Sequence, residues 1–339
     1  MKKSKQLPIV VPRFSTYHYQ LASGIPAAAN PGLDNWFINN CVSLRCGRRF
    51  LDGFTTPEVN IEASDMKSMP YMEKVMVSGK FLDGKTAHDI ICRMIDRDYY
   101  VYYDGVDDKP IKGKTFYGMW HFRHDGIICG YDDAEKTYTV AAYDSRWVCR
   151  PFKIRQSHFE RGRKFYADRD LAGSFIALKA DPDIIELDVP GITEKLREYL
   201  RSNITVYPES GRETVYGSAV HQYLAMYLDR LHDGRIPYGR KDKRILRVIW
   251  EHKKCMLQRL ERMSLAPGQE TSDAVKEYRR VVNIADNARL CYAKYVMKED
   301  KALLNTVRDK LLKVWKLERE ILTRFLSETE EKQNAMAIH

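Results

Sequence analysis

The stretch His124-Asp-Gly-Ile-Ile-Cys-Gly-Tyr-Asp-Asp-Ala-Glu-Lys-Thr-Tyr-Thr-Val-Ala-Ala-Tyr-Asp144 decides the expected fold. It predicts a β-hairpin, because two runs rich in Ile, Val, Thr and Tyr flank the polar turn 132–136. Residues that face each other across a hairpin lie equally far from the centre of its turn, and His124 and Asp144 both lie ten residues from Ala134. Their Cβ atoms would then be roughly 4.5–5.5 Å apart on one face. Such a carboxylate can fix the imidazole tautomer and leave the other ring nitrogen as a base.

The pattern of the chain changes near residue 185 from short β-rich runs to long helical periods. Before that point, runs bounded by Gly, Asp or Pro predict strands at 99–103, 127–131, 138–143 and 175–178. Two helices are expected there, one at 86–96 and one starting near Cys41. Apolar periodicity then predicts helices at 193–202, 214–232, 241–263, 272–297 and 301–327. The sequence therefore predicts an α+β domain over 1–185 and an all-helical domain over 186–339.

Length and composition support a folded protein of about two domains. The chain has 339 residues, of which 44% are hydrophobic and 30% charged, and this excludes wholesale disorder. No apolar run approaches the roughly 20 residues of a membrane-spanning helix, and the apolar stretch after the basic N-terminus is too short for a signal peptide. We therefore expect a cytoplasmic protein with no membrane partner. Seven cysteines without a Cys-x-x-Cys pair do not favour a disulfide framework or a structural zinc site.

The net charge of +10 makes an acidic partner worth considering. Segment 145–169 carries eight Lys and Arg against two acidic residues, and segment 235–262 carries ten against three. The sequence does not favour nucleic acid, because it holds no Gly-rich RNA motif, zinc-finger spacing or convincing helix-turn-helix. Each basic segment can be either a solvated helix face or a docking surface for an acidic protein.

A nucleophile for the hairpin is suggested by Cys41. A loop-like segment with Pro31-Gly32 precedes it and helix-compatible residues follow, which predicts a thiol near a helix N-terminus. There the helix dipole favours a thiolate, and the backbone N–H groups can help to form an oxyanion hole. The side-chain amide of Asn35 is the candidate second donor. Cys46 is the rival nucleophile, expected more than a turn inside the helix.

The order of these motifs resembles the papain-like cysteine fold. The chain is most similar to the butirosin-biosynthesis protein H N-terminal-like family, whose pattern is echoed by Cys41, Gly53, His124 and 130–133. It also resembles amide-forming papain-like enzymes of closthioamide-type nonribosomal assembly. Asn35 stands where the fold usually has a glutamine. The resemblance covers roughly residues 30–180 and implies an antiparallel sheet, a nucleophile helix and acyl transfer in specialised-metabolite biosynthesis.

The resulting hypothesis is a ping-pong acyltransferase. His124, oriented by Asp144, would deprotonate Cys41, and Asn35 would stabilise the oxyanion. The resemblance implies an acidic carrier protein with a phosphopantetheine thioester as donor and an amine as acceptor. No cofactor of the chain's own is expected, and no ATP or dinucleotide loop occurs. The alternatives are a cysteine peptidase or amide hydrolase and a non-catalytic binding module. A metal site from His121-x-x-His124 with Cys41 or Cys46 is disfavoured, because two histidines three residues apart share a face only in a helix.

Overall fold

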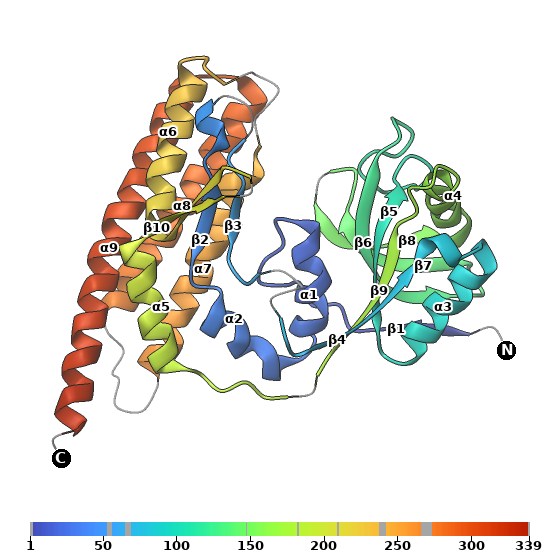
Figure 1. The fold of residues 1–339 in the computed structure, drawn as a ribbon, viewed down its shortest axis with the longest axis horizontal. Helices are drawn as coiled ribbons and strands as arrows, with labels where there is room; N and C mark the ends of the chain where they lie inside the picture. The colour runs from blue at the N-terminus through green and yellow to red at the C-terminus, as the bar shows by residue number, and fades with distance from the viewer. Residues whose placement is uncertain are drawn as a thin grey trace. The chain divides into compact units, whose positions relative to one another are not determined.

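The structure is a computed structural model and describes residues 3–52, 56–64, 69–146, 148–181, 183–208, 210–236, 242–265 and 273–337. The chain is a mixed α/β protein with antiparallel sheets and C-terminal helices (Figure 1). It divides into two compact units. Unit 1 comprises Met1–Asp34 and Asp65–Ile184, and unit 2 comprises Asn35–Ser64 and Ile185–His339. Segment 35–64 therefore belongs with the C-terminal half, whereas the sequence analysis assigned it to the first domain.

Unit 1 is built on a seven-stranded sheet in the order β4-β9-β5-β6-β7-β8, with β1 also pairing with β6. All of its ladders are antiparallel. The four predicted strands are confirmed. The strands are β1 (Ser4–Gln6), β4 (Met72–Ser78), β5 (Tyr100–Asp107), β6 (Arg123–Asp132), β7 (Thr137–Tyr143), β8 (Cys149–Arg155) and β9 (Ser174–Ala180).

Three α-helices accompany this sheet, namely α1 (His18–Ala28), α3 (Gly84–Asp96) and α4 (Gln156–Ala167). Helix α3, predicted at 86–96, is confirmed. It starts after Asp83, whose carboxylate accepts the Thr86 N–H at 2.7 Å and so satisfies one of the unpaired donors of the first turn. Ala87, Ile91 and Ile95 recur at helical spacing and are buried in the core of unit 1. Helices α1 and α4 were not predicted.

The central hairpin follows the predicted register only in part. Ile127 faces Ala141 and Ile128 faces Val140, as a turn centred on Ala134 requires. A β-bulge after Ile128 shifts the register by one residue toward the turn, so that Asp132 faces Thr137. Beyond Ile127 the β6–β7 ladder stops, and the residues on either side find other partners.

Unit 2 combines a small sheet with long helices. The sheet has the order β10-β11-β2-β3. Helix α9 packs on α6 and α8, and α7 packs on α8. The elements are α2 (Asp34–Asn40), β2 (Leu44–Gly47), β3 (Val59–Ile61), α5 (Val189–Arg201), β10 (Asn203–Tyr207), β11 (Arg212–Tyr216), α6 (Val220–His232), α7 (Arg244–Ser264), α8 (Asp273–Lys298) and α9 (Ala302–Ala337).

The five predicted C-terminal helices are present, but the prediction of an all-helical domain over 186–339 was wrong, because β10 and β11 form a hairpin between α5 and α6. Segment 214–216 is part of β11, so α6 begins only at Val220. The apolar stripe expected on this helix is buried, from Val220 to Leu231. Gly53, Lys241 and Ser272, and residues 237–241 of the second basic segment, lie outside the described residues. Within the described part of the chain, every helix is too short or too polar to cross a bilayer.

Candidate functional sites

The four residues predicted for catalysis are divided between the units. Cys41 and Asn35 belong to unit 2, whereas His124 and Asp144 belong to unit 1. Cys41 follows the C-terminal end of α2 instead of starting a helix, because its N–H donates to the Phe37 carbonyl at 3.0 Å. The negative end of the helix dipole disfavours a thiolate there. Cys41 is also 0% exposed, so its surroundings do not suit a nucleophile.

Asn35 and Cys46 serve the structure of unit 2 as well. Asn35 donates through Nδ2 to the Ile185 carbonyl at 2.9 Å and accepts at Oδ1 from Arg262, so both ends of its amide are engaged. Cys46 lies in β2, where a helix was expected, because this segment pairs with β11. Burial, with the Glu58 charge adding to it, raises the pKa of the Cys46 thiol to about 12. The rival thiol is therefore neutral at pH 7.

His124 has a carboxylate partner, but this partner is Asp108 and not Asp144. The Nδ1 atom of His124 lies 2.6 Å from Asp108 Oδ2. In the sheet, His124 faces Val106 of β5, because the β6–β7 ladder has ended before it. Asp108 is 0% exposed, whereas the His124 side chain keeps 12% of its surface accessible. His124 therefore has an aspartate partner as expected, but this partner is Asp108 instead of Asp144.

Asp144 has a structural role instead. It forms an isolated β-bridge with Lys114. Its carboxylate caps the turn that follows β7 and pairs with the guanidinium groups of Arg146 and Arg150. The groups that donate to it are the N–H of Arg146 at 2.8 Å, the N–H of Val148 at 3.0 Å and Nε of Arg150 at 2.5 Å. These contacts stabilise the connection between β7 and β8. Asp144 therefore has a structural role that does not require a catalytic one.

Three potential metal ligands converge beside the His124–Asp108 pair. His18 stands at the first turn of α1, and His124 and Asp125 are neighbours in β6. Each residue offers one ligand atom, and the three atoms all lie within 4.8 Å of one another. His18 Nδ1 is 3.2 Å from Asp125 Oδ1. Metal–ligand bonds of about 2.0–2.1 Å in a tetrahedron place two ligand atoms about 3.3 Å apart. The spacing of this pair therefore fits ligands of one ion.

An outer shell orients two of these ligands. Lys114, which is fully buried, places Nζ 3.2 Å from Asp108 Oδ1, so its charge compensates the carboxylate. When His124 donates Nδ1–H to Asp108, its lone pair lies on Nε2. The Tyr102 hydroxyl donates to Asp125 Oδ2 at 2.5 Å. The two oxygens of Asp125 thus have different partners, because Tyr102 contacts Oδ2 and His18 lies beside Oδ1.

His18, Asp108 and Asp125 were not predicted as site residues, and the structure shows why. Adjacent residues of a regular strand point to opposite faces, which argues against His124 and Asp125 in one site. Opposite Asp125, however, β5 contains a bulge in which Asp104 and Gly105 face a single residue. Gly105 has a φ of +74°, a conformation that favours glycine. The Asp-Gly pair within a β-rich run was the available signal for this bulge, and no local signal pointed to His18.

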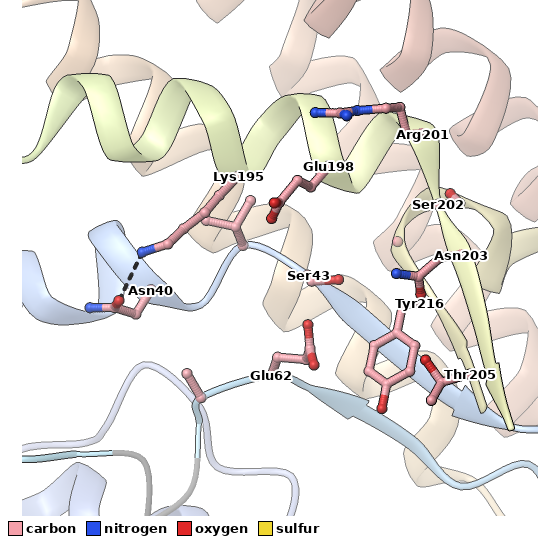
Figure 2. Close-up of a pocket in the computed structure, with 13 residues that line it drawn as sticks. Asn40, Ser43, Glu62, Lys195, Glu198, Arg201, Ser202, Asn203, Thr205 and Tyr216 are labelled. Carbon is pink, nitrogen blue, oxygen red and sulfur yellow. Dashed lines mark hydrogen bonds between the residues drawn. The ribbon is translucent and has the colours of Figure 1, made fainter. Parts of the chain in front are cut away.

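Unit 2 holds a separate polar pocket of about 780 Å³ between α5, β2, β3 and the β10–β11 hairpin. Figure 2 shows Glu62 and Glu198 directing their carboxylates toward Ser43 from two sides. Burial raises the pKa of Glu62, and the Glu198 charge acts in the same direction against the lowering effect of Ser43 and Arg45. Hydroxyl groups of Thr205 and Tyr216 and the cationic side chains of Lys195 and Arg201 also line the pocket. The pocket therefore offers both donors and acceptors to a polar ligand.

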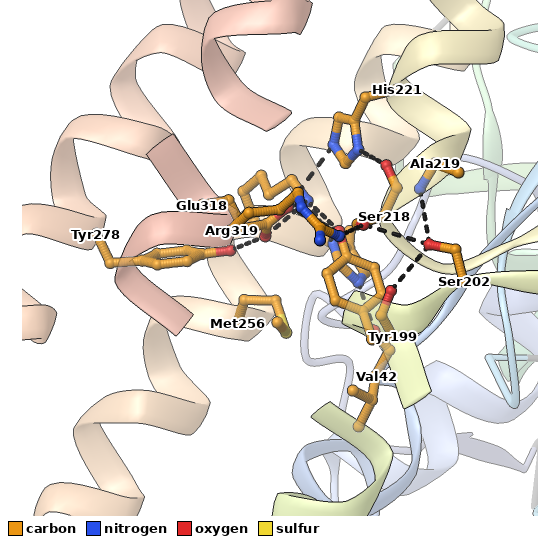
Figure 3. A network of polar contacts seen from close by, with 12 residues as sticks. Val42, Tyr199, Ser202, Ser218, Ala219, His221, Met256, Tyr278, Glu318 and Arg319 are labelled. Carbon is orange, nitrogen blue, oxygen red and sulfur yellow. Dashed lines mark hydrogen bonds and ion pairs between the residues drawn. The ribbon is translucent and has the colours of Figure 1, made fainter. Parts of the chain in front are cut away.

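A buried ion pair joins the helices of unit 2 close to this pocket. Lys253 of α7 lies 2.6 Å from Glu318 of α9, and both side chains are 0% exposed. Tyr199 donates to Glu318 at 2.7 Å, Tyr278 donates to it as well, and His221 Nε2 lies 4.0 Å away (Figure 3). Burial lowers the pKa of Lys253 to about 8, against the opposing effect of Glu318. The pair is therefore charged at pH 7 and connects five helices.

Comparison with known proteins adds no relative. No family model matches the chain, and no curated protein matches it. The resemblance to papain-like acyltransferases therefore remains an expectation drawn from short motifs.

Proposed function

We propose that unit 1 is a hydrolase that binds one zinc-like divalent ion through His18, His124 and Asp125. The observation that supports this most is the convergence of three ligand side chains, two of which are held from behind by Asp108 and Tyr102. Three protein ligands leave a fourth position for water, as in zinc hydrolases with two histidines and one carboxylate. A thiol nucleophile is then unnecessary, because metal-bound water supplies the attacking oxygen.

The proposed reaction is hydrolysis of an ester or thioester. His18, His124 and Asp125 would hold the ion, and Asp108 would keep the His124 imidazole in its ligating tautomer. A divalent ion held there would supply a water with a pKa lowered to about 7, whose hydroxide could attack the carbonyl carbon. The C–O or C–S bond would then break, and the leaving group would take up the proton that the water had released to solvent.

Acyl transfer to an amine is the second candidate, and the 2.6 Å contact between His124 and Asp108 favours it. In this version His124 Nε2 takes a proton from the amine as its nitrogen attacks a carrier-bound thioester. The C–S bond breaks, and the imidazolium returns the proton to the departing thiolate. This route needs neither Cys41 nor a metal. The basic segment 146–169 would suit an acidic carrier protein.

Metal dependence separates the two candidates. The full-length protein is stripped with a chelator and assayed with S-acetyl-N-acetylcysteamine, with and without added Zn²⁺ and with and without glycine ethyl ester as acceptor. We expect zinc-dependent release of acetate, and a loss of it in His18→Ala and His124→Ala. Zinc binding to Asp108→Asn should weaken by about 10–100-fold, which is the usual effect of losing an outer-shell partner.

Asp144→Asn is the matched control, since it alters the acid that the sequence predicted. Its zinc affinity should stay within about twofold of the unmodified protein, because Asp144 contacts none of the three ligands. Release of acetate that persists without metal would contradict the first candidate. Metal-independent acetylation of the amine that depends on His124 would establish the second.

A further inference from the structure

A second group of potential ligands in unit 1 consists of His88, Cys92 and Asp133. His88 and Cys92 are four residues apart on α3 and therefore share one face of the helix. Asp133 follows β6 in the turn of the central hairpin. Each of the three side chains is partly exposed, and one ligand atom of each lies within 4.8 Å of the others. Together they offer a nitrogen, a sulfur and an oxygen.

The nitrogen–oxygen separation in this group matches a tetrahedral zinc site. His88 Nε2 lies 3.3 Å from Asp133 Oδ1, and zinc bonds of about 2.0 Å at a tetrahedral angle place two such atoms about 3.3 Å apart. Cys92 Sγ lies 3.6 Å from Nε2 and 3.8 Å from Nδ1, so it stands beside the imidazole ring. The sulfur must therefore turn about its side-chain torsion to join an ion that is bound on the Nε2 lone pair.

The surroundings of His88 orient it as a ligand. Its Nδ1 lies 2.7 Å from the hydroxyl of Tyr138, a residue that is 2% exposed. When the imidazole donates Nδ1–H to this oxygen, the lone pair lies on Nε2, the nitrogen beside Asp133. Asp133 Oδ1 is buried without a hydrogen bond, so the pair with His88 is its interaction in the described structure. A bound cation would satisfy this oxygen.

A cavity of about 220 Å³ adjoins the group and gives a fourth position room. Its wall includes His88 and Tyr138 together with Ala87, Ile91 and Gln156. The cavity therefore gives solvent access to the His88 side of the group. Asp89 and Asp96, which act on Cys92 electrostatically, add negative charge that favours a divalent ion over a neutral occupant.

We propose that His88, Cys92 and Asp133 form a site for a thiophilic divalent cation, with Zn²⁺ as its natural occupant. Bound there, the ion ties α3 to the turn between β6 and β7. Binding exchanges the Cys92 S–H proton for a metal–sulfur bond, and the proton is released to solvent. This site is independent of the hydrolase proposed above and needs no substrate.

Cobalt titration of the full-length, metal-stripped protein tests this inference. We expect a near-ultraviolet thiolate-to-cobalt charge-transfer band that saturates at one ion per chain and is displaced by Zn²⁺. Cys92→Ser should abolish the band. Tyr138→Phe should weaken cobalt binding by roughly 10–100-fold, which is the usual effect of losing a hydrogen-bond partner of a ligand. His88→Ala removes a ligand itself and should weaken cobalt binding by more than that.

Cys291→Ser is the matched control, because Cys291 is also a half-buried thiol but belongs to unit 2. Its band should equal that of the unmodified protein. His124→Ala should also keep the charge-transfer band, because the site of His18, His124 and Asp125 contains no sulfur. The failure of one proposal can therefore be distinguished from the failure of the other. A band that survives in Cys92→Ser, or cobalt binding without any band, would overturn the inference. Asp133→Asn provides a second variant if Cys92→Ser fails to fold.

Discussion

Replacement of Lys253 by methionine should strongly destabilise unit 2. Lys253 lies 2.6 and 2.8 Å from the two oxygens of Glu318, and neither side chain has any exposed surface. The substitution keeps most of the side-chain volume but leaves the Glu318 carboxylate buried with tyrosine hydroxyls and no cation. Breaking a buried pair in this way costs about 3–5 kcal/mol of the free energy of unfolding.

The effect is measured by hydrogen exchange of peptides from α7 and α9 in the native protein. Lys254→Met is the matched control on the same helix, because Lys254 is exposed and its ammonium lies 4.5 Å from the Trp250 ring centre. That contact contributes about 0.5–1 kcal/mol. The double variant Lys253→Met/Glu318→Met should recover part of the loss, because no unpaired charge remains buried. A Lys253→Met opening free energy equal to that of Lys254→Met would refute this reasoning.

Two further predictions concern the same unit. Burial, with the Lys253 charge acting in the same direction, lowers the pKa of His221 from 6.5 to about 3. The unfolded chain therefore binds a proton that the folded chain does not between these values, so stability falls as pH drops below 6.5, by about 2 kcal/mol at pH 5. Denaturant unfolding of His221→Gln should show a shallower pH slope, and an unchanged slope would contradict this. Gly217→Ala should destabilise by more than Gly211→Ala, since both have positive φ (+83° and +61°) but only at Gly217 would a new Cβ lie 2.5 Å from a carbonyl oxygen. Equal unfolding midpoints would argue against a steric cost.

Elements defined by local periodicity were predictable from the sequence. Helix α6 has an apolar stripe at helical spacing, and the stripe is buried as expected. The hairpin of β6 and β7 follows from two β-rich runs around a polar turn, and its pairing at Ile127 and Ala141 agrees with the predicted turn centre. These features depend on neighbours within about twenty residues, which a single sequence contains.

Features that depend on distant pairing were not predictable. The segment after Cys41 is helix-compatible by composition, yet it forms β2 because β11 pairs with it. The carboxylate beside His124 is Asp108 because β7 ends before it reaches His124 and the neighbouring strand β5 continues. Each candidate site in unit 1 thus combines a residue that the hairpin revealed with others that only the three-dimensional fold brings near.

The interleaving of the two units has a consequence for the order of synthesis. Strand β2 leaves the ribosome early, but Val215, which faces its Cys46, is translated about 170 residues later. Until then one edge of β2 lacks its partner, and such an edge is a template for aggregation. A polypeptide terminated at residue 184 would retain this orphan strand permanently. Excising 35–64 together with the C-terminal half, and rejoining the flanking ends with a short linker, is therefore the more promising way to obtain the first unit alone.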